Sequence, residues 1–431
     1  MSEIRTVFAR RIWDSRGNPT VEVEVALADG SIGRAAAPAG ASRGSREAVD
    51  LRDGGARLGG KDVARAVSNV NGAIAKSLKG MAAIDQQAVD DALIQLDGTP
   101  AKSNLGGNAT VATSLAVLQA AAASESKPLW AYLADTHGSA PSIPLPEIQV
   151  FGGGAHAGRR VDVQDFMIMV PGAESFSEAM AITSEIYRAA GAILERRRGS
   201  AGVADEGGWW PQFESNEEGL ETLVAAIEAA GESPGERVVI SLDIAASEFG
   251  GKGRYELALE NRTVDTDSMI EILGRWLDKY PIAAIEDPLA EDDPDGMRKF
   301  TDKFGSRIQI IGDDYLATRT ELVLEAAKAG ACNAALIKVN QAGTVSESLA
   351  AFRAARRNGL GTVISARSGE TEDVGICHLA VGLNAGQLKV GSFSRSERMA
   401  KWNECIRISE HPGAGEFVGG KPLERTWWGR D

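Results

Sequence analysis

The chain has 431 residues with 43% hydrophobic side chains, a length that suits a barrel with a companion domain better than one small domain. Its formal net charge of −14 argues against nucleic acid and anionic membranes as partners. Three dispersed cysteines indicate a reducing compartment without disulfides. No apolar stretch is long enough to cross a bilayer or to serve as a signal region, so we expect a cytoplasmic protein.

The N-terminal part reads as a small antiparallel sheet followed by a loop. Residues 21–25 alternate strictly in polarity, which is typical of a half-buried strand. Residues 36–45 then form a run of small side chains. This run is either a flexible connector or a lid that closes over a ligand, with Gly40 and Gly44 as hinges.

The next segment has apolar residues at helical spacing, and a proline-rich stretch follows it. Apolar residues recur at helical intervals between residues 61 and 136, whereas residues 140–146 contain three prolines. We therefore predict an N-terminal α+β domain over residues 1–139, with the lid loop 36–45, and a second domain over residues 140–431.

Five short apolar runs in the second domain each end in a charged or hydroxyl residue. The runs cover residues 238–243, 282–287, 308–314, 334–338 and 362–368. Fully apolar runs separated by helical stretches are typical of parallel strands covered on both sides, and in such barrels chemistry occurs at the C-terminal strand ends. We expect one mouth to gather Asp243, Glu286, Asp313, Lys338 and Ser368. Three carboxylates facing a lysine indicate a hard metal ion beside a general base.

Two glycine-rich loops add further polar groups to this mouth. The loop 152–158 contains His156, which is either a structural histidine or a functional one held where the backbone approaches a ligand. The loop 204–208 contains Glu206, which is either a surface turn residue or a catalytic acid. Lys389 lies near the end of the last expected strand.

Eleven stretches, in order along nearly the whole chain, resemble those of enolase. They cover residues 14–23, 40–42, 51–54, 156–158, 205–208, 247–249, 285–288, 312–314, 338–341, 368–373 and 395–398. The resemblance implies an α/β fold in which an N-terminal α+β domain caps an enolase-type (β/α)8 barrel of ββαα(βα)6 order. It also implies a homodimer or a higher oligomer.

The resemblance further implies Mg²⁺ as cofactor, in one high-affinity site and a second site filled together with substrate. The implied ligands are Asp243, Glu286 and Asp313 for the first ion and Ser42 for the second. Lys338 would remove the proton next to the substrate carboxylate, and Lys389 would help to neutralise that carboxylate. The implied leaving-group and substrate-binding residues are Glu206, His156, Gln164, Arg367 and Ser368.

This assignment makes physical sense because a carbon acid beside a carboxylate is far weaker than any lysine. Forming the dianion requires concentrated positive charge in a preorganised site, which two Mg²⁺ ions and Lys389 would supply. The same cations are expected to lower the pKa of Lys338, so that its neutral amine can act as base.

The departures from enolase lie around the same site. Enolases carry histidine where this chain has Ala366 and glutamate where it has Asp165, which empties space and removes proton donors beside the leaving group. Arg43 and Arg159 add positive charge suited to phosphate, phosphonate or carboxylate oxygens. Trp209-Trp210, where enolases have Phe-Ala, could stack on a nucleobase. Each change alone could be neutral drift, but together they suggest a changed substrate.

The pattern resembles the enolase-like carboxyphosphonoenolpyruvate synthases of phosphonate antibiotic biosynthesis. That resemblance implies a CMP-activated phosphonoformate donor, hence a cytidine nucleotide partner, and a phosphoglycerate acceptor. Two alternatives stay open. The first is ordinary enolase, which converts 2-phosphoglycerate to phosphoenolpyruvate and water. The second is an inactive enolase-like binding protein, whose expected sign, loss of metal ligands or lysines, is absent from this sequence.

Overall fold

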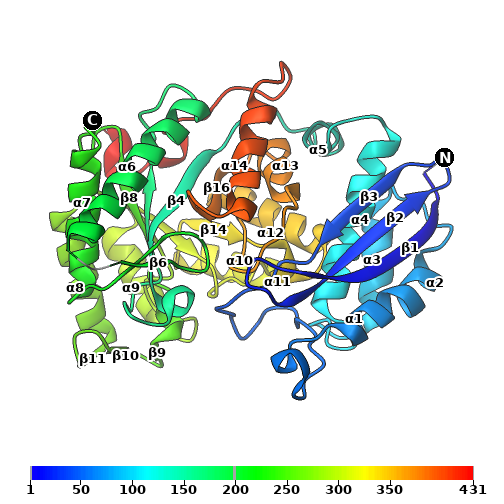
Figure 1. The fold of residues 1–431 in the computed structure, drawn as a ribbon, viewed down its shortest axis with the longest axis horizontal. Helices are drawn as coiled ribbons and strands as arrows, with labels where there is room; N and C mark the ends of the chain where they lie inside the picture. The colour runs from blue at the N-terminus through cyan, green and yellow to red at the C-terminus, as the bar shows by residue number, and fades with distance from the viewer. Residues whose placement is uncertain (1, 198–199, 431) are drawn as a thin grey trace.

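The computed structural model describes residues 2–197 and 200–430 and shows two parts side by side (Figure 1). The N-terminal part begins with the antiparallel strands β1 (Ile4–Trp13), β2 (Pro19–Leu27) and β3 (Ile32–Ala36). Alternate residues of β2 are fully buried, as the polarity pattern predicted, and β2 and β3 pack on helix α4 (Gly107–Ser124). A Cβ at Gly33 would lie 2.1 Å from the carbonyl oxygen of Ala116, so only glycine permits this close sheet–helix contact.

The remaining N-terminal helices pack around this sheet. They are α1 (Ala64–Asn69), α2 (Ala75–Leu78), α3 (Gln86–Asp97) and α5 (Leu129–His137). The helix expected from the spacing of residues 63–78 is present but contains a π-helical turn, Val70–Ile74, between α1 and α2. None of the helices in the described residues is both long and apolar enough to span a membrane.

Asp90 joins the N-terminal helices to the barrel part. Its carboxylate accepts hydrogen bonds from the Ser114 hydroxyl at 2.6 Å, the Gln86 amide at 3.1 Å and the backbone N–H of Ser346 at 2.8 Å. We expect Asp90→Ala to lower the free energy of unfolding by about 2 kcal/mol, because buried donors would lose their acceptor. Urea denaturation measures this change. Asp91→Ala, at the exposed neighbouring position, should change it by less than about 0.5 kcal/mol.

The second part is a closed barrel of eight strands. They are β4 (Leu145–Gly152), β5 (Asp165–Met169), β8 (Val239–Asp243), β12 (Ile282–Glu286), β13 (Gln309–Gly312), β14 (Ala334–Ile337), β15 (Gly361–Ser365) and β16 (Gly386–Ser392). Pairing of β16 with β4 closes the barrel. β5 is antiparallel to both neighbours, whereas the other barrel strands pair in parallel, so the predicted ββαα(βα)6 barrel is confirmed.

Helices cover the outside of the barrel. They are α6 (Phe176–Arg196), α7 (Asn216–Ala229), α8 (Thr266–Lys279), α9 (Pro294–Phe304), α10 (Thr320–Ala329), α12 (Val345–Arg357), α13 (Gly375–Gly382) and α14 (Ser396–Ser409). The short α11 (Val339–Ala342) instead follows Lys338 at the barrel mouth and packs on α4 and α12. Side chains at the N-caps of α6, α7, α8, α9 and α12 accept the exposed backbone N–H groups of the first turn.

Five short strands lie outside the eight strands of the barrel. β6 (Ser200–Val203) and β7 (Trp209–Pro211) form a hairpin on the edge of β4, and β9 (Gly250–Gly251), β10 (Arg254–Leu257) and β11 (Arg262–Asp265) form a separate small sheet. The β6–β7 connection carries Glu206 to the barrel mouth.

Candidate active site

The C-terminal ends of the barrel strands and the loop after β3 enclose one small cavity. The cavity is lined by twelve residues singled out from the sequence: Gly40, Ser42, His156, Gln164, Asp165, Glu206, Asp243, Lys338, Ala366, Arg367, Ser368 and Lys389. Glu286 and Asp313 contact the two lysines directly. Because parallel strands end at the same edge of the barrel, residues more than 200 positions apart meet here.

Lys389 lies between two of the expected metal ligands. Its Nζ is 2.8 Å from Asp243 Oδ2 and 2.7 Å from Glu286 Oε2, and the backbones of these two acids are paired in register on β8 and β12. Burial and the neighbouring Asp243 charge raise the pKa of Glu286 well above its ordinary value. Burial opposes the charge of Lys389, but the surrounding carboxylates outweigh it and raise the pKa of the lysine.

Lys338 is held by the third expected ligand. Its Nζ lies 2.5 Å from Asp313 Oδ2, and the other carboxylate oxygen of Asp313 accepts a 2.8 Å hydrogen bond from Gln341 Nε2. Burial alone would lower the pKa of Lys338, but the Asp313 carboxylate raises it above its ordinary value. The protein groups alone therefore do not produce the lowered pKa expected from the sequence. The charge of Asp313 is the main group that keeps the proton on Lys338.

The donor set suits a hard cation. Asp243, Glu286 and Asp313 present carboxylate oxygens, the ligands that Mg²⁺ prefers, and Glu286 Oε1 is buried without a hydrogen-bond partner among the described residues. Asp287, Asp313 and Asp314 form a second acidic group whose ligand atoms lie within 4.8 Å of one another. The Asp287 carboxylate already accepts the backbone N–H groups of Asp313 and Asp314, so we regard it as a brace for the loop.

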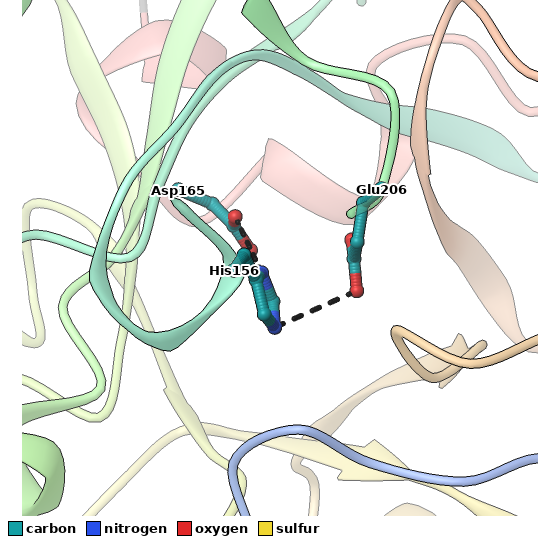
Figure 2. Close-up of side chains that lie close together, drawn as sticks. All are labelled: His156, Asp165 and Glu206. Carbon is teal, nitrogen blue, oxygen red and sulfur yellow. Dashed lines mark hydrogen bonds and ion pairs between the residues drawn. The ribbon is translucent and has the colours of Figure 1, made fainter. Parts of the chain in front are cut away.

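His156 lies in the same cavity between two carboxylates (Figure 2), and one of them, Asp165, also lies 3.6 Å from Lys389 Nζ through its Oδ2. Its Nδ1 lies 3.2 Å from Asp165 Oδ1 and its Nε2 lies 3.7 Å from Glu206 Oε1. Burial lowers the pKa of His156, but Glu206 and Asp165 raise it to a net value above the ordinary one. Burial opposes ionisation of Asp165, yet the nearby His156 charge lowers the pKa of that carboxyl to about 2. The cluster therefore favours a protonated imidazole beside an ionised Asp165.

Comparison with protein-family models identifies the family to which this fold belongs. Residues 4–133 match the model of the enolase N-terminal domain, and residues 140–426 match the enolase C-terminal TIM barrel domain. The chain belongs to the enolase family. It is an enolase-like enzyme, and since enolases typically bind Mg²⁺, the acidic groups described above are suited to that ion.

In this enolase-family structure the loop 36–45 lies against the barrel mouth. The backbone N–H of Ala41 donates to Ser368 Oγ at 2.6 Å, and Arg367 Nη2 donates to the carbonyl oxygen of Ser42 at 2.9 Å. A Cβ at Gly40 would lie 2.0 Å from Arg367 Nη2, so glycine is required for this approach. Arg367 and Ser368, expected to hold substrate phosphate, thus also hold the loop in place.

The sequence reading missed Glu47, which fixes Arg367. Arg367 Nη1 lies 2.9 Å from Glu47 Oε2, Nη2 lies 3.1 Å from Glu47 Oε1, and both side chains are buried. No motif or polarity pattern marks Glu47. Only a fold that brings residues 320 positions apart into contact could show its role.

Three further residues are placed differently from the expectation that they face the ligand. Arg43 lies outside the cavity, half-exposed, with its Nη1 3.8 Å from Asp50. Arg159 is 61% exposed and its Nη2 lies 2.6 Å from Glu248 Oε2. Trp209 stacks on Tyr187 at a ring separation of 5.1 Å and donates its indole N–H to the Tyr187 carbonyl oxygen. Charge and aromaticity indicated a ligand contact, but nearer partners of the protein itself engage these side chains.

Proposed function

We propose that this enolase-family enzyme forms an enolate at C2 of a phosphoglycerate-type substrate and acts as a carboxyphosphonoenolpyruvate synthase. The observation that carries this proposal is the contrast between the two sides of one cavity. Lys338 and Lys389 sit among the expected acidic ligands, as carbanion chemistry requires. The leaving-group side has Ala366 where enolases carry histidine, and an ionised Asp165 where they carry glutamate.

The part of the cavity that contains Lys338 and Lys389 would provide a base and a positive charge for the carbanion. Lys338 would remove the C2 proton with its neutral Nζ, and Lys389 would stay charged and face the substrate carboxylate, because its acidic neighbours raise its pKa. When bound by Asp243, Glu286 and Asp313, Mg²⁺ would supply further positive charge to stabilise the dianion. The raised pKa of Lys338 means that the charge of Asp313 opposes formation of the neutral base.

The leaving-group side favours a group that departs without a strong acid. An ionised Asp165 cannot donate a proton and Ala366 offers none, so expulsion of hydroxide would depend on His156 and Glu206 alone, whereas a phosphate needs no proton to leave. A phosphate leaves as a stable anion, and a protonated His156 would face that anion with a charged donor. This chemistry supports elimination of phosphate over elimination of water.

The complete reaction would then occur in two balanced steps. The C2 hydroxyl of 3-phosphoglycerate attacks the phosphorus of CMP-phosphonoformate, which breaks the bond to the CMP oxygen, and the hydroxyl proton is lost to solvent. Lys338 then takes the C2 proton, the C2–C3 double bond forms, and inorganic phosphate departs from C3. The products are carboxyphosphonoenolpyruvate, CMP and phosphate.

Phosphorus NMR tests this proposal directly. Incubation with CMP-phosphonoformate, 3-phosphoglycerate and Mg²⁺ should produce a new phosphonate resonance together with CMP and inorganic phosphate in equal amounts. The absence of any new phosphonate would reject it. A parallel assay with 2-phosphoglycerate, followed by phosphoenolpyruvate absorbance, addresses the ordinary enolase reaction, and rapid turnover there would make that reaction the better assignment.

A further inference from the structure

Two loops that meet at the His156 cluster carry a second pair of side chains beyond it. The backbone N–H of Asp205 donates to the His156 carbonyl oxygen at 3.1 Å, so the loop carrying His156 and the loop carrying Glu206 are in direct contact. Four residues after each of these catalytic candidates come Arg160 and Trp210. The Arg160 guanidinium lies 4.5 Å from the centroid of the Trp210 ring, in a cation–π contact.

Both members of this pair have a buried donor without an acceptor. Arg160 Nη1 and Trp210 Nε1 are shielded from solvent, yet neither makes a hydrogen bond with the residues that the structure describes. Arg160 also has no ion-pair partner among the residues that the structure describes. The adjacent Arg159 and Trp209, by contrast, have their donors occupied by Glu248 and Tyr187. A buried donor left unpaired costs free energy, which an acceptor on a ligand would recover.

We propose that Arg160 and Trp210 form a subsite for the phosphate of the cytidine nucleotide, an inference that rests on the proposed function. An arginine fork and an indole N–H are donors only, so an anionic oxygen is the complementary group. Neither residue lines the cavity that holds the lysines. They lie on the two loops that meet at His156, which does line it, so the nucleotide of a donor substrate, extending beyond the three-carbon acceptor, is the part of the ligand that we assign to them.

Calorimetric titration of the full-length protein in the presence of Mg²⁺ tests this subsite with three probes: CMP, cytidine and 3-phosphoglycerate. We expect Trp210→Phe, which keeps the ring but removes the N–H, to raise the Kd of CMP by about tenfold, and Arg160→Gln to do so by at least as much. The Kd of 3-phosphoglycerate should stay within about twofold, because that probe does not reach the pair. Cytidine should bind more weakly than CMP and respond to neither change.

Matched controls separate ligand binding from packing. Trp209→Phe removes an indole N–H that is already engaged by Tyr187, and Arg188→Gln removes an exposed guanidinium on α6. Both should leave the Kd of CMP within about twofold, and thermal unfolding establishes that each variant is folded. Should Trp210→Phe fail to fold, Arg160→Gln decides the question.

The subsite is overturned when the wild-type protein does not bind CMP, or when Arg160→Gln leaves the Kd of CMP unchanged. An equal loss of 3-phosphoglycerate binding would also overturn it, because the pair would then belong to the acceptor. Failure of the proposed function is a separate result. If the wild-type protein forms the phosphonate but the variants bind CMP as tightly as it does, only the subsite is rejected. If the variants bind CMP more weakly but the wild-type protein forms no phosphonate, only the synthase reaction is rejected.

Discussion

Replacing Lys338 with alanine should slow C2 proton exchange of the phosphoglycerate substrate in deuterated water by about 10³-fold or more. Lys338 Nζ is the amine that contacts Asp313 inside the cavity, and the alanine variant places no proton acceptor there. Proton NMR follows the loss of the C2 signal, so the measurement reports proton removal even when no leaving group departs. Product formation should fall by a similar factor.

The matched control for this change is Lys328→Ala, on the exposed face of α10. This variant should catalyse C2 proton exchange at the wild-type rate. A folded Lys338→Ala protein whose exchange stays within about tenfold of wild type would contradict the assignment of Lys338 as the base. Lys389 would then be the next amine to test. Exchange that is absent from the wild-type protein would instead favour the inactive binding protein.

Saturating Mg²⁺ should raise the free energy of unfolding of the wild-type protein, by about 2.7 kcal/mol at a concentration 100 times the Kd. Glu286→Gln should abolish most of this gain. The substitution keeps the size of the side chain but removes one of three carboxylates, and Glu286 Oε1 has no other partner in the described structure. Urea denaturation with and without Mg²⁺ measures the difference. If Mg²⁺ raised the free energy of unfolding equally in both proteins, Glu286 would not be a ligand of the ion.

The same variant should change how stability depends on pH in the presence of a chelator. Burial, and then the charge of Asp243, raise the folded-state pKa of Glu286 above its ordinary value of 4.5. The folded protein therefore binds this proton more tightly than the unfolded chain. Stability is greatest below the unfolded pKa and falls as pH rises from there through the raised folded pKa. In the Glu286→Gln variant, stability should fall less steeply with pH than in the wild-type protein. Parallel pH profiles of the two proteins would show that Glu286 does not cause the fall.

Matched controls follow from the neighbouring acids. Glu291→Gln, on the half-exposed loop after β12, should respond to Mg²⁺ and to pH as the wild-type protein does. Asp243→Asn should resemble Glu286→Gln in losing the Mg²⁺ response, because the two acids are paired in register and are expected ligands of the same ion.

Local patterns in the chain were sufficient to predict the barrel and the position of its mouth. A strand buried on both faces must be apolar along its length, so the runs that became β8, β12, β13, β14 and β15 could be recognised without coordinates. The polar residues that end those runs could then be placed at one edge, because parallel strands end together. Asp243, Glu286, Asp313 and Lys338 were found in this way.

The partner of each side chain was decided only by the tertiary structure. Polarity periods report which face of an element is buried, but hydrogen bonds form over about 3 Å between segments whose approach depends on the whole fold. Nothing in the sequence paired Glu47 with Arg367, turned Arg159 toward Glu248, or left Arg160 beside Trp210 without an acceptor. The candidate catalytic residue types could thus be predicted from the chain, whereas packing decided which side chains have partners within the protein and which do not.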